Sequence, residues 1–527
     1  MKSPPLTRRT FLHHTANGLG AIALASLLNP AKGDTPAPRR PAVDRWDGVL
    51  HPLHHRAKAK RVIYLYMAGG PSHLESFDHK PELARRHGQP MPESLTRGQP
   101  IAQLQGAQLR CFAPQHPFRR YGKSGQEIAA IFPHIGSVAD DICIIRSLKT
   151  EAINHDPAHT FMNTGTTISG RPAMGSWIYY GLGTEAEDLP GFVVLTSTGR
   201  FGQSQPIAQR QWNAGFLPSR FQGIHLRGTG DPVLYLPSPA GVTQERERDV
   251  VDAIQDLNHL HDADVADPEI ATRVTQYEMA FRMQSSVPSL RDFASEPQAV
   301  LDMYGIRGAD GSFGANCLMA RRLAERGVRF IQLYHRDWDH HGGIRPQIAG
   351  SASEVDRPCA ALLRDLKARG MLEDTLVLFG GEFGRTPMAQ GSDGRDHNPF
   401  GFTLWLAGGG VKGGVAYGAT DDYGYHAVED KVEIHEGEEE GKLSRKNFRY
   451  MVYSAEIEKV DYLLKMYLKI RLKKVRLRPR SCSSTASTCS RTSRRPRRSC
   501  RPPSSSSSAP TPSCATTTTR TTSSGTS

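Results

Sequence analysis

The sequence lacks several features that would assign it to a common class of protein. Beyond the N-terminal region it has no run of about 18 uninterrupted apolar residues, so we expect no membrane span in the mature chain. It has no GxSxG nucleophile motif. Four of its eight cysteines lie in the main part of the chain, too scattered for a disulfide framework or a CxxC metal site. We expect these four to be small core residues: Cys111, Cys143, Cys317 and Cys359.

Excess positive charge is absent from most of the chain. The whole sequence has 66 Lys and Arg against 53 Asp and Glu, but residues 441–527 alone hold 20 of the former and 3 of the latter. Residues 1–440 therefore carry 46 basic and 50 acidic residues, a net charge of −4. A nucleic-acid-binding domain carries its basic residues on its folded part, so we expect no nucleic-acid partner.

The first 40 residues are typical of an export signal. Arg8 and Arg9, followed by Phe11 and Leu12, precede a short apolar segment at 18–28. This order is the twin-arginine pattern, although an amphipathic helix is the alternative. We expect residues 1–40 to be a signal peptide and leader, the twin-arginine export machinery to be a partner, and the mature protein to reside in the periplasm or at the cell surface.

The next part of the chain, residues 41–437, reads as one domain. Short apolar runs rich in β-branched and aromatic residues predict buried strands at 61–67, 142–148, 191–197, 328–334, 375–380 and 402–407. Helical spacing of leucines predicts helices at 313–326 and 353–369, each followed by glycine. Alternating strands and helices predict an α/β fold with a mostly parallel central sheet and helices on both faces. Residues 198–300 are less regular, and we expect insertions there.

Polar clusters follow four of the predicted strands. In open α/β sheets, ligands bind outside the carboxyl ends of the strands. We therefore expect these clusters to converge on one site. They comprise 69–73, 154–159, 335–341, and 381–385 together with 395–397.

The cluster 335–341 contains three histidines and two aspartates. Imidazole and carboxylate together suit Zn²⁺, Mn²⁺ or Fe, whereas oxygen-only sets suit Ca²⁺ and Mg²⁺. We expect Asp339, His340 and His341 to be metal ligands and His335 to contact substrate. A solvated polar loop is the alternative.

The cluster 154–159 predicts a helix start, with Asp156 as N-cap and Pro157 at the first helical position. Such a helix N-terminus favours a bound anion, for example sulfate or phosphate. His155 would lie just outside the helix and His159 in its first turn, so we expect His155, Asp156 and His159 to be catalytic. The alternative is that Asp156 only caps the helix.

The remaining clusters add further candidates. Glu382 directly follows a buried strand, where a carboxylate is costly unless it is paired or bound to a metal. Arg385 is its possible ion-pair partner, or a substrate contact. Asp396 and His397 are candidate ligands, with a turn role as the alternative. Ser72 and His73 follow a glycine turn and are candidate substrate contacts, although a turn-forming serine is the simpler interpretation of Ser72.

Two stretches resemble sulfatases. Residues 356–385 are similar to the C-terminal core of that family, in which Glu382 would replace a metal-binding Asp and Phe383 the neighbouring His or Asn. Residues 155–165 resemble the sulfatase Cys-x-Pro-Ser-Arg signature in spacing, with His155 at the nucleophile position and His159 at the Arg position.

As a whole, residues 1–435 resemble the bacterial domain-of-unknown-function family 1501. The matching segments are the twin-arginine leader and residues 67–72, 154–158, 170–172, 338–341, 381–385 and 394–398. The family is grouped with the alkaline-phosphatase-like superfamily. The resemblance implies that fold and a crevice holding a divalent metal such as Zn, Mn or Ca.

These features together predict an exported, metal-dependent, sulfatase-like hydrolase of sulfate or phosphate esters, with a small-molecule or polysaccharide substrate. Here Asp339, His340, His341, Glu382, Asp396 and His397 would supply the metal ligands. The alternative is a non-catalytic cell-surface protein that binds polysaccharide, because no Ser, Thr or Cys stands at the sulfatase nucleophile position.

The C-terminal part of the sequence departs from the family. Residues 438–480 are basic and match nothing in it. Residues 481–527 hold 27 Ser and Thr and 7 Arg among 47 residues, with no large apolar residue. Such a composition cannot form a core and predicts disorder. We interpret this ending as a reading-frame error, a chimeric assembly or a degraded gene, and resequencing the locus tests it. If it is right, we expect poor stability and low metal occupancy.

Overall fold

A nine-stranded sheet forms the centre of the structure, a computed structural model that describes residues 45–50, 53, 57–233, 241–265 and 268–434. The predicted leader and both C-terminal segments lie outside these residues. The strand order is β12-β4-β11-β8-β1-β7-β5-β6, with β15 beside β4. The strands are β1 (Arg61–Met67), β4 (Ile142–Lys149), β5 (Phe192–Ser197), β6 (Ile224–Leu226), β7 (Phe330–His335), β8 (Thr375–Gly380), β11 (Phe402–Gly408), β12 (Val415–Tyr417) and β15 (Val432–Glu433).

The sheet is mostly parallel, as predicted from the alternating pattern. Among its described pairs only those of β11, with β4 and with β8, are antiparallel. In the register of the parallel strands, Met67 pairs with His335 and Tyr66 with Gly380. Strands β1, β7 and β8 therefore end at the same edge, and the segments that follow them emerge side by side.

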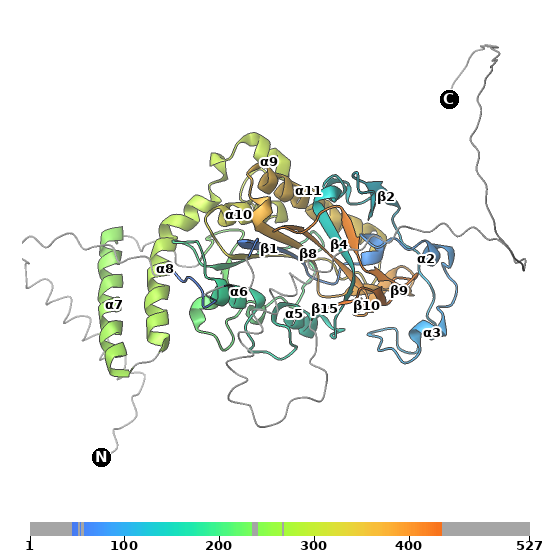
Figure 1. Cartoon of the computed structure of the whole chain (residues 1–527), viewed down its shortest axis with the longest axis horizontal. Helices are drawn as coiled ribbons and strands as arrows, with labels where there is room; N and C mark the ends of the chain where they lie inside the picture. The colour runs from blue at the N-terminus through green and yellow to red at the C-terminus, as the bar shows by residue number, and fades with distance from the viewer. Residues whose placement is uncertain (1–44, 51–52, 54–56, 234–240, 266–267, 435–527) are drawn as a thin grey trace, which may run out of the picture. The chain divides into compact units, whose positions relative to one another are not determined.

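Helices cover both faces of the sheet (Figure 1). The faces alternate along β1 because successive side chains of a strand point in opposite directions. Ile63 and Leu65 pack into one core with α10 (Phe313–Glu325) and α11 (Ile344–Ala368). Tyr64 and Tyr66 pack into a second core with α5 (His155–Thr164) and α6 (Met174–Leu182). The predicted fold class is confirmed.

Helix α11 begins at Ile344 rather than at the predicted residue 353. The sequence does not predict this first part of the helix, because it contains Pro346 and Gly350, and both residue types have low helix propensity. In the structure Pro346 lies in the first turn, where proline is tolerated. The glycine has a packing reason, since a Cβ at Gly350 would lie 2.6 Å from the ring of Phe201.

The start of helix α5 also differs from the prediction. Asn154, in an extended conformation, is the N-cap, and its carbonyl accepts the first helical hydrogen bond from Ala158. His155 is thus the first helical residue and Asp156 the second, so the predicted N-cap at Asp156 is wrong. The helix ends at Gly165, which adopts the left-handed conformation that suits glycine (φ 73°).

Smaller elements surround the sheet. Short strand pairs are β2 (Phe118–Tyr121) with β3 (Gln126–Ala129), β9 (Gly384–Gln390) with β10 (Gly394–Asn398), and β13 (Ala419–Thr420) with β14 (Ala427–Glu429). Short helices are α2 (Pro81–Arg85), α3 (Glu93–Thr96), α4 (Pro133–Gly136), α9 (Gln298–Tyr304), η1 (His73–Glu75), η2 (Ala139–Asp141), η3 (Gln209–Gln211), η4 (Ser219–Phe221), η5 (Phe293–Ser295) and η6 (Leu372–Asp374).

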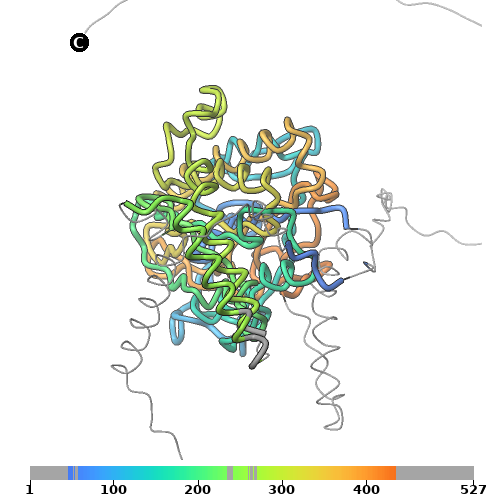
Figure 2. The backbone as a smooth tube through the Cα atoms, turned by 90° about the vertical axis from the view of Figure 1, so that its left-hand side faces the viewer, coloured from blue at the N-terminus to red at the C-terminus, as the bar shows by residue number. Residues whose placement is uncertain are grey.

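The irregular stretch 198–300 contains two long helices, α7 (Gln244–Val265) and α8 (Pro268–Arg291), which face the viewer in green in Figure 2. Helix α7 packs on α8, where Arg248 pairs with Glu278 at 2.7 Å. The four cysteines of the domain are free and buried, as expected. Among the described residues, no helix is long and apolar enough to cross a membrane.

Candidate metal centre

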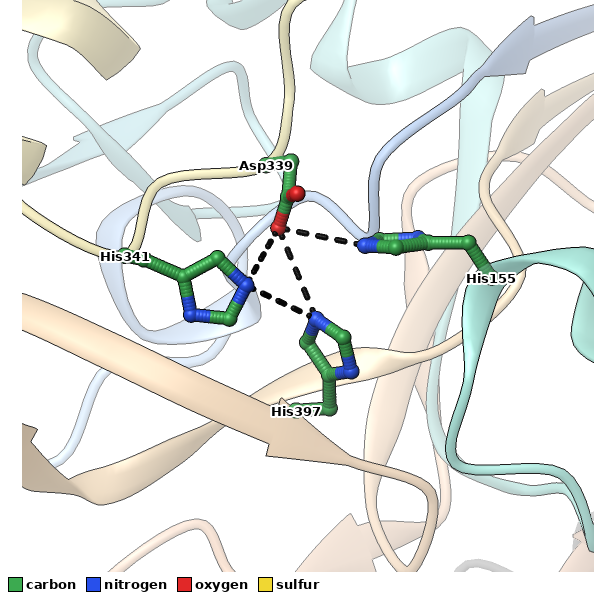
Figure 3. A group of neighbouring side chains, drawn as sticks. All are labelled: His155, Asp339, His341 and His397. Carbon is green, nitrogen blue, oxygen red and sulfur yellow. Dashed lines mark hydrogen bonds and ion pairs between the residues drawn. The ribbon is translucent and has the colours of Figure 1, made fainter. Parts of the chain in front are cut away.

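Side chains from separate strand ends converge at the carboxyl edge of the sheet (Figure 3). His155, Asp339, His341 and His397 each offer one ligand atom, and these atoms all lie within 4.8 Å of one another. They come from the start of α5, from the loop after β7 and from β10. Glu382, after β8, joins His155 and His159 in an adjoining group that meets the same limit. The predicted convergence of the polar clusters is confirmed.

The carboxylate of Asp339 lies at the middle of the first group. Its Oδ1 atom is 2.9 Å from Nε2 of His341, 3.2 Å from Nε2 of His155 and 3.5 Å from Nε2 of His397. Burial alone would raise the pKa of Asp339, but the three histidines and Arg385 hold it well below its usual range. The carboxylate is therefore ionised and available as a ligand.

Neighbouring acceptors fix the tautomers of two histidines. Nδ1 of His341 lies 2.5 Å from Oε1 of Gln390, and Nδ1 of His397 lies 2.7 Å from the carbonyl of Ile153. Because both partners accept hydrogen bonds, we assign the hydrogen of each ring to Nδ1. Each Nε2 then presents a lone pair to the centre, and the two Nε2 atoms are 3.0 Å apart. Two such lone pairs repel one another unless a metal cation or a shared proton lies between them.

His155 is oriented in the same way by a buried carboxylate. Its Nδ1 lies 2.7 Å from Oε1 of Glu382, which also accepts a hydrogen bond from the backbone N–H of Gly69 at 2.9 Å. Its Nε2 is directed to the centre and makes no hydrogen bond. Burial lowers the pKa of His155, but Asp339 and Glu382 together raise it above its ordinary value. A carboxylate behind a histidine is a common arrangement around protein-bound metals.

The adjoining group shares His155 with the first, and its other two members are closed to solvent. His159 and Glu382 are fully buried, and the hydroxyl of Tyr66 lies 2.8 Å from Nδ1 of His159. Burial lowers the pKa of His159, so the ring is neutral. Burial would raise the pKa of Glu382, but His159 and His155 bring it below the ordinary value. Glu382 therefore contacts His155 directly, and His159 contacts Glu382 on its other oxygen.

Glycine is required where β1 meets the centre. Gly69 has a positive φ of 121°, and a Cβ there would lie 2.6 Å from the backbone nitrogen of Asp339. The missing side chain lets the turn after β1 approach the loop after β7 closely enough for its N–H to reach Glu382.

Arg385, predicted to contact substrate, is instead fully buried behind the ligands. Its guanidinium donates to the carbonyls of Gly69 and Gly70 and, at 2.6 Å, to Oδ1 of Asp339. Because its donors are occupied by the protein, Arg385 can orient Asp339 but is not free to bind a substrate.

Several predicted site residues lie outside the two groups. Oδ2 of Asp396 accepts hydrogen bonds from the backbone N–H groups of Gln103 and Leu104, at 2.7 and 3.1 Å, and so anchors a loop. The side chain of His340 points in a different direction from those of Asp339 and His341. It is buried beside Trp338 and belongs to neither group. The structure therefore does not bring either of these predicted ligands to the centre.

Asp156 is also turned away from the centre. Its side chain is 57% exposed and pairs with Arg210. This follows from the corrected helix start, because in a helix His155 and His159, four residues apart, share one face and Asp156 lies on another.

The other three predicted contacts to substrate also have partners within the fold. The Ser72 hydroxyl donates to Glu75, and Nε2 of His73 lies 2.7 Å from the carbonyl of Gly424. Nδ1 of His335 accepts a hydrogen bond from the indole of Trp338 at 3.0 Å. All three side chains are buried, which explains why each is paired internally.

Two residues near the site, Tyr66 and Gln203, are not predicted from the sequence. Tyr66 contacts His159, and Gln203 contacts the backbone of Asp339. Tyr66 reads as an apolar strand residue. Gln203 lies in a loop without a motif. A buried hydroxyl at the end of β1 was the one available signal, because such a group needs a partner.

The four converging atoms fit a divalent metal. Three imidazole nitrogens and one carboxylate oxygen form the four-ligand set typical of Zn²⁺, and they also suit Mn²⁺, whereas Ca²⁺ prefers oxygen ligands. The side chains of His155, Asp339 and His341 are 15%, 22% and 26% exposed, so one side of the cluster is open to solvent. The fold and the site thus define an α/β protein with a candidate metal centre at the carboxyl edge of its sheet.

The sequence matches the family described as "Protein of unknown function (DUF1501)" over residues 59–437, and the chain belongs to this family. No curated protein matches it. Residues 438–527 lie outside the matched part.

The structure is similar to sulfatase-like and alkaline-phosphatase-like proteins. One is Ps i-CgsB, solved in complex with k-i-k-neocarrahexaose, at 9% identity with 70% of each chain covered and a TM-score of 0.28. Another is the PsFucS1 sulfatase from Pseudoalteromonas sp., at 12% identity with 70% of this chain and 66% of that chain covered and a TM-score of 0.27. A third is the alkaline phosphatase of the Antarctic bacterium TAB5, at 10% identity with 69% and 95% covered and a TM-score of 0.26. Similarity this distant carries no conclusion about substrate.

Proposed function

We propose that this protein is a metal-dependent hydrolase of sulfate or phosphate esters, with a small molecule or polysaccharide as its substrate. The convergence of His155, Asp339, His341 and His397 is the observation that carries the proposal. Ligand atoms from three separate segments meet at one point that is partly open to solvent. A solvated polar loop would not place the Nε2 atoms of two histidines 3.0 Å apart.

The position of α5 favours an anionic substrate. Because His155 is its first residue, the N-terminus of this helix lies at the cluster. The unpaired N–H groups and the dipole of a helix N-terminus attract sulfate and phosphate groups. An ester of either acid would therefore be drawn to the open side of the centre.

In this proposal the chain's own residues hold and orient the centre. His155, Asp339, His341 and His397 are the ligands, Glu382 holds the Nδ1 hydrogen of His155, and Arg385 fixes the carboxylate of Asp339. A divalent metal at this place would supply Lewis-acid polarisation of an ester oxygen and activation of water. His159, predicted to be catalytic, has a buried ring that is hydrogen-bonded to Tyr66, and in this proposal it supports Glu382.

The test is an assay of the metal-free full chain with an aryl sulfate and an aryl phosphate, before and after addition of Zn²⁺ or Mn²⁺. We expect turnover of at least one ester that depends on added metal. His397→Ala should abolish that turnover. Absence of turnover with both esters and with every metal contradicts the hydrolase function.

The contacts of His155, His159 and Ser72 favour a second function. Nitrogens of His155 lie 2.7 and 3.2 Å from two carboxylates, His159 is fully buried, and the Ser72 hydroxyl donates to Glu75. A metal-binding, non-catalytic protein that recognises surface polysaccharide agrees with these contacts. Stoichiometric metal together with polysaccharide binding and no ester turnover would support this alternative.

Export through the twin-arginine route belongs to the same proposal. That route carries folded proteins and suits a protein that takes up its metal before export. Replacement of Arg8 and Arg9 by Lys should retain the protein in the cytoplasm. Cell fractionation measures this directly, and unchanged recovery from the periplasm or cell surface contradicts it.

A further inference from the structure

Gln203 pairs with the backbone of the metal-centre residue Asp339. Its Nε2 donates to the carbonyl of Asp339 at 3.0 Å, and its Oε1 accepts from the N–H of Asp339 at 3.1 Å. The side-chain amide thus satisfies both backbone groups of Asp339, as a neighbouring strand would. It is the contact that fixes the main chain of this residue, whereas Arg385 fixes its carboxylate.

The loop that carries Gln203 is itself anchored near the centre. The fully buried carboxylate of Asp337 accepts hydrogen bonds from the N–H groups of Phe201, Gly202 (3.1 Å) and Gln203 (2.6 Å). Asp337 adopts a left-handed conformation (φ 74°), which is uncommon outside glycine. A Cβ on Gly199 would lie 2.3 Å from Oδ2 of Asp337, so the loop closes tightly around this carboxylate.

The two contacts connect one loop to the other in both directions. Asp337 holds residues 201–203 through its side chain, and Gln203 returns to Asp339, two residues further along. Asp339 lies between β7 and α11 and belongs to no helix or strand. A residue in such a segment has no ladder of backbone hydrogen bonds to restrict it. We name Gln203 and Asp337 the loop clamp.

We propose that Gln203 is a positioning residue of the metal centre, held in place by Asp337, and that it sets the backbone of Asp339 so that Oδ1 meets the three histidines. The inference rests on the proposed metal-dependent function. Partners of this outer kind typically alter metal affinity by about 10–100-fold when they are removed. A loop clamp with a structural role only would change the stability of the protein and leave the bound metal as it was.

Cobalt(II) binding to the full chain separates these roles, because the visible absorption of Co²⁺ reports on ligand geometry as well as on affinity. The variant is Gln203→Met, which keeps the length of the side chain and removes both hydrogen bonds. The matched control is Gln209→Met, an exposed glutamine on η3 in the same stretch. Asp337→Asn is a second variant, because asparagine tolerates the left-handed conformation.

We expect Gln203→Met to weaken Co²⁺ binding by about 10–100-fold and to shift the visible bands. The unfolding temperature of the metal-free chain should change by no more than about 4 °C. Asp337→Asn should act in the same direction with a smaller effect, and Gln209→Met should match the wild type.

Wild-type affinity and an unchanged spectrum in Gln203→Met would overturn the role of Gln203 while leaving the metal centre intact. Equal weakening in Gln209→Met would also overturn it, because the effect would then be general. A wild-type chain that binds no Co²⁺ would overturn the proposed metal centre and this inference with it.

Discussion

The hairpin of β9 and β10 carries two buried arginines that differ in the carboxylate each one meets. Arg395 binds Glu75 through two nitrogens, at 3.0 and 2.6 Å, and both side chains are fully buried. Arg385 binds Asp339 at 2.6 Å, but that carboxylate is 22% exposed and is shared with three histidines. We call Arg395–Glu75 the closed pair, because it is shut off from solvent, and Arg385–Asp339 the open pair, because its carboxylate reaches solvent.

The difference indicates two roles. The Arg395–Glu75 pair stabilises the fold, and the Arg385–Asp339 pair orients a carboxylate that can bind a ligand. Arg395 also donates to the carbonyls of Thr386, Phe112 and Ala113, so its donors are satisfied inside the protein. Asp339 still directs an oxygen toward Nε2 of His341 and of His397, two rings whose hydrogen is assigned to Nδ1. A buried pair with every donor satisfied contributes to the fold, whereas a carboxylate surrounded by lone pairs needs a cation.

The largest effect should come from breaking the closed pair. Glu75→Ala leaves Arg395 as an uncompensated buried charge, and we expect the free energy of unfolding to fall by about 3–5 kcal/mol. Chemical denaturation measures this loss. The folded fraction should bind metal as the wild type does, because Glu75 contacts no member of the cluster.

Glu93→Ala is the control for the closed pair. Glu93 also binds an arginine, Arg97, but both side chains are about 80% exposed, and exposed pairs contribute little. We expect no measurable change in its unfolding. A similar loss in the two variants would contradict the distinction between closed and exposed pairs.

The second effect concerns the open side. His397→Ala removes a proposed ligand. We expect metal affinity to fall by about 100-fold or more, which is at least the largest effect of losing a residue that only supports a ligand. Calorimetric titration with Zn²⁺ measures it. His87→Ala, an exposed histidine elsewhere in the chain, should bind as the wild type does. Unchanged affinity in His397→Ala would remove His397 from the centre.

Metal should also stabilise the wild-type chain. At about 100 times its dissociation constant, a ligand that binds only the folded state adds about 2.7 kcal/mol. Unfolding curves with and without Zn²⁺ should show this gain in the wild type. His397→Ala should show almost none at the same concentration. A gain of equal size in both chains would place the binding site elsewhere.

The sequence predicts that the polar clusters converge, because each strand end is recognisable from a short stretch of sequence and the sheet then brings these ends together. The runs that form β1, β4, β7 and β8 are recognisable by their apolar residues. These four strands run in the same direction, so their carboxyl ends lie at one edge of the sheet. His155, Asp339 and Glu382 therefore meet as expected. The individual roles of these residues stay predictions until metal binding is measured.

The sequence does not predict which of several neighbouring polar residues faces the centre. Asp339 and His341 reach it and His340 between them does not, because side chains in an extended segment alternate. The predicted N-cap failed for a related reason, since Asn154 and Asp156 are both good caps and only the backbone decides. Contacts between loops, such as Gln203 with Asp339, have no sequence pattern at all.

The smallest effect compares two buried carboxylates, Glu75 and Glu382, after loss of charge alone. Glu382→Gln keeps an oxygen that can accept from Gly69 and His155, so we expect the fold to be retained. It removes the negative charge behind His155, which makes Nε2 a weaker ligand, and metal affinity should fall by about 10-fold. Glu382→Ala should lower metal content further and leave the fold largely intact. Glu75→Gln, the matched change in the closed pair, should lower stability and leave metal affinity unchanged. Zinc titration gives the metal affinity of each glutamine variant, and denaturation gives its stability. If Glu382→Gln lowers stability as much as Glu75→Gln does, or if Glu75→Gln weakens metal binding, the distinction between the open and closed pairs is wrong.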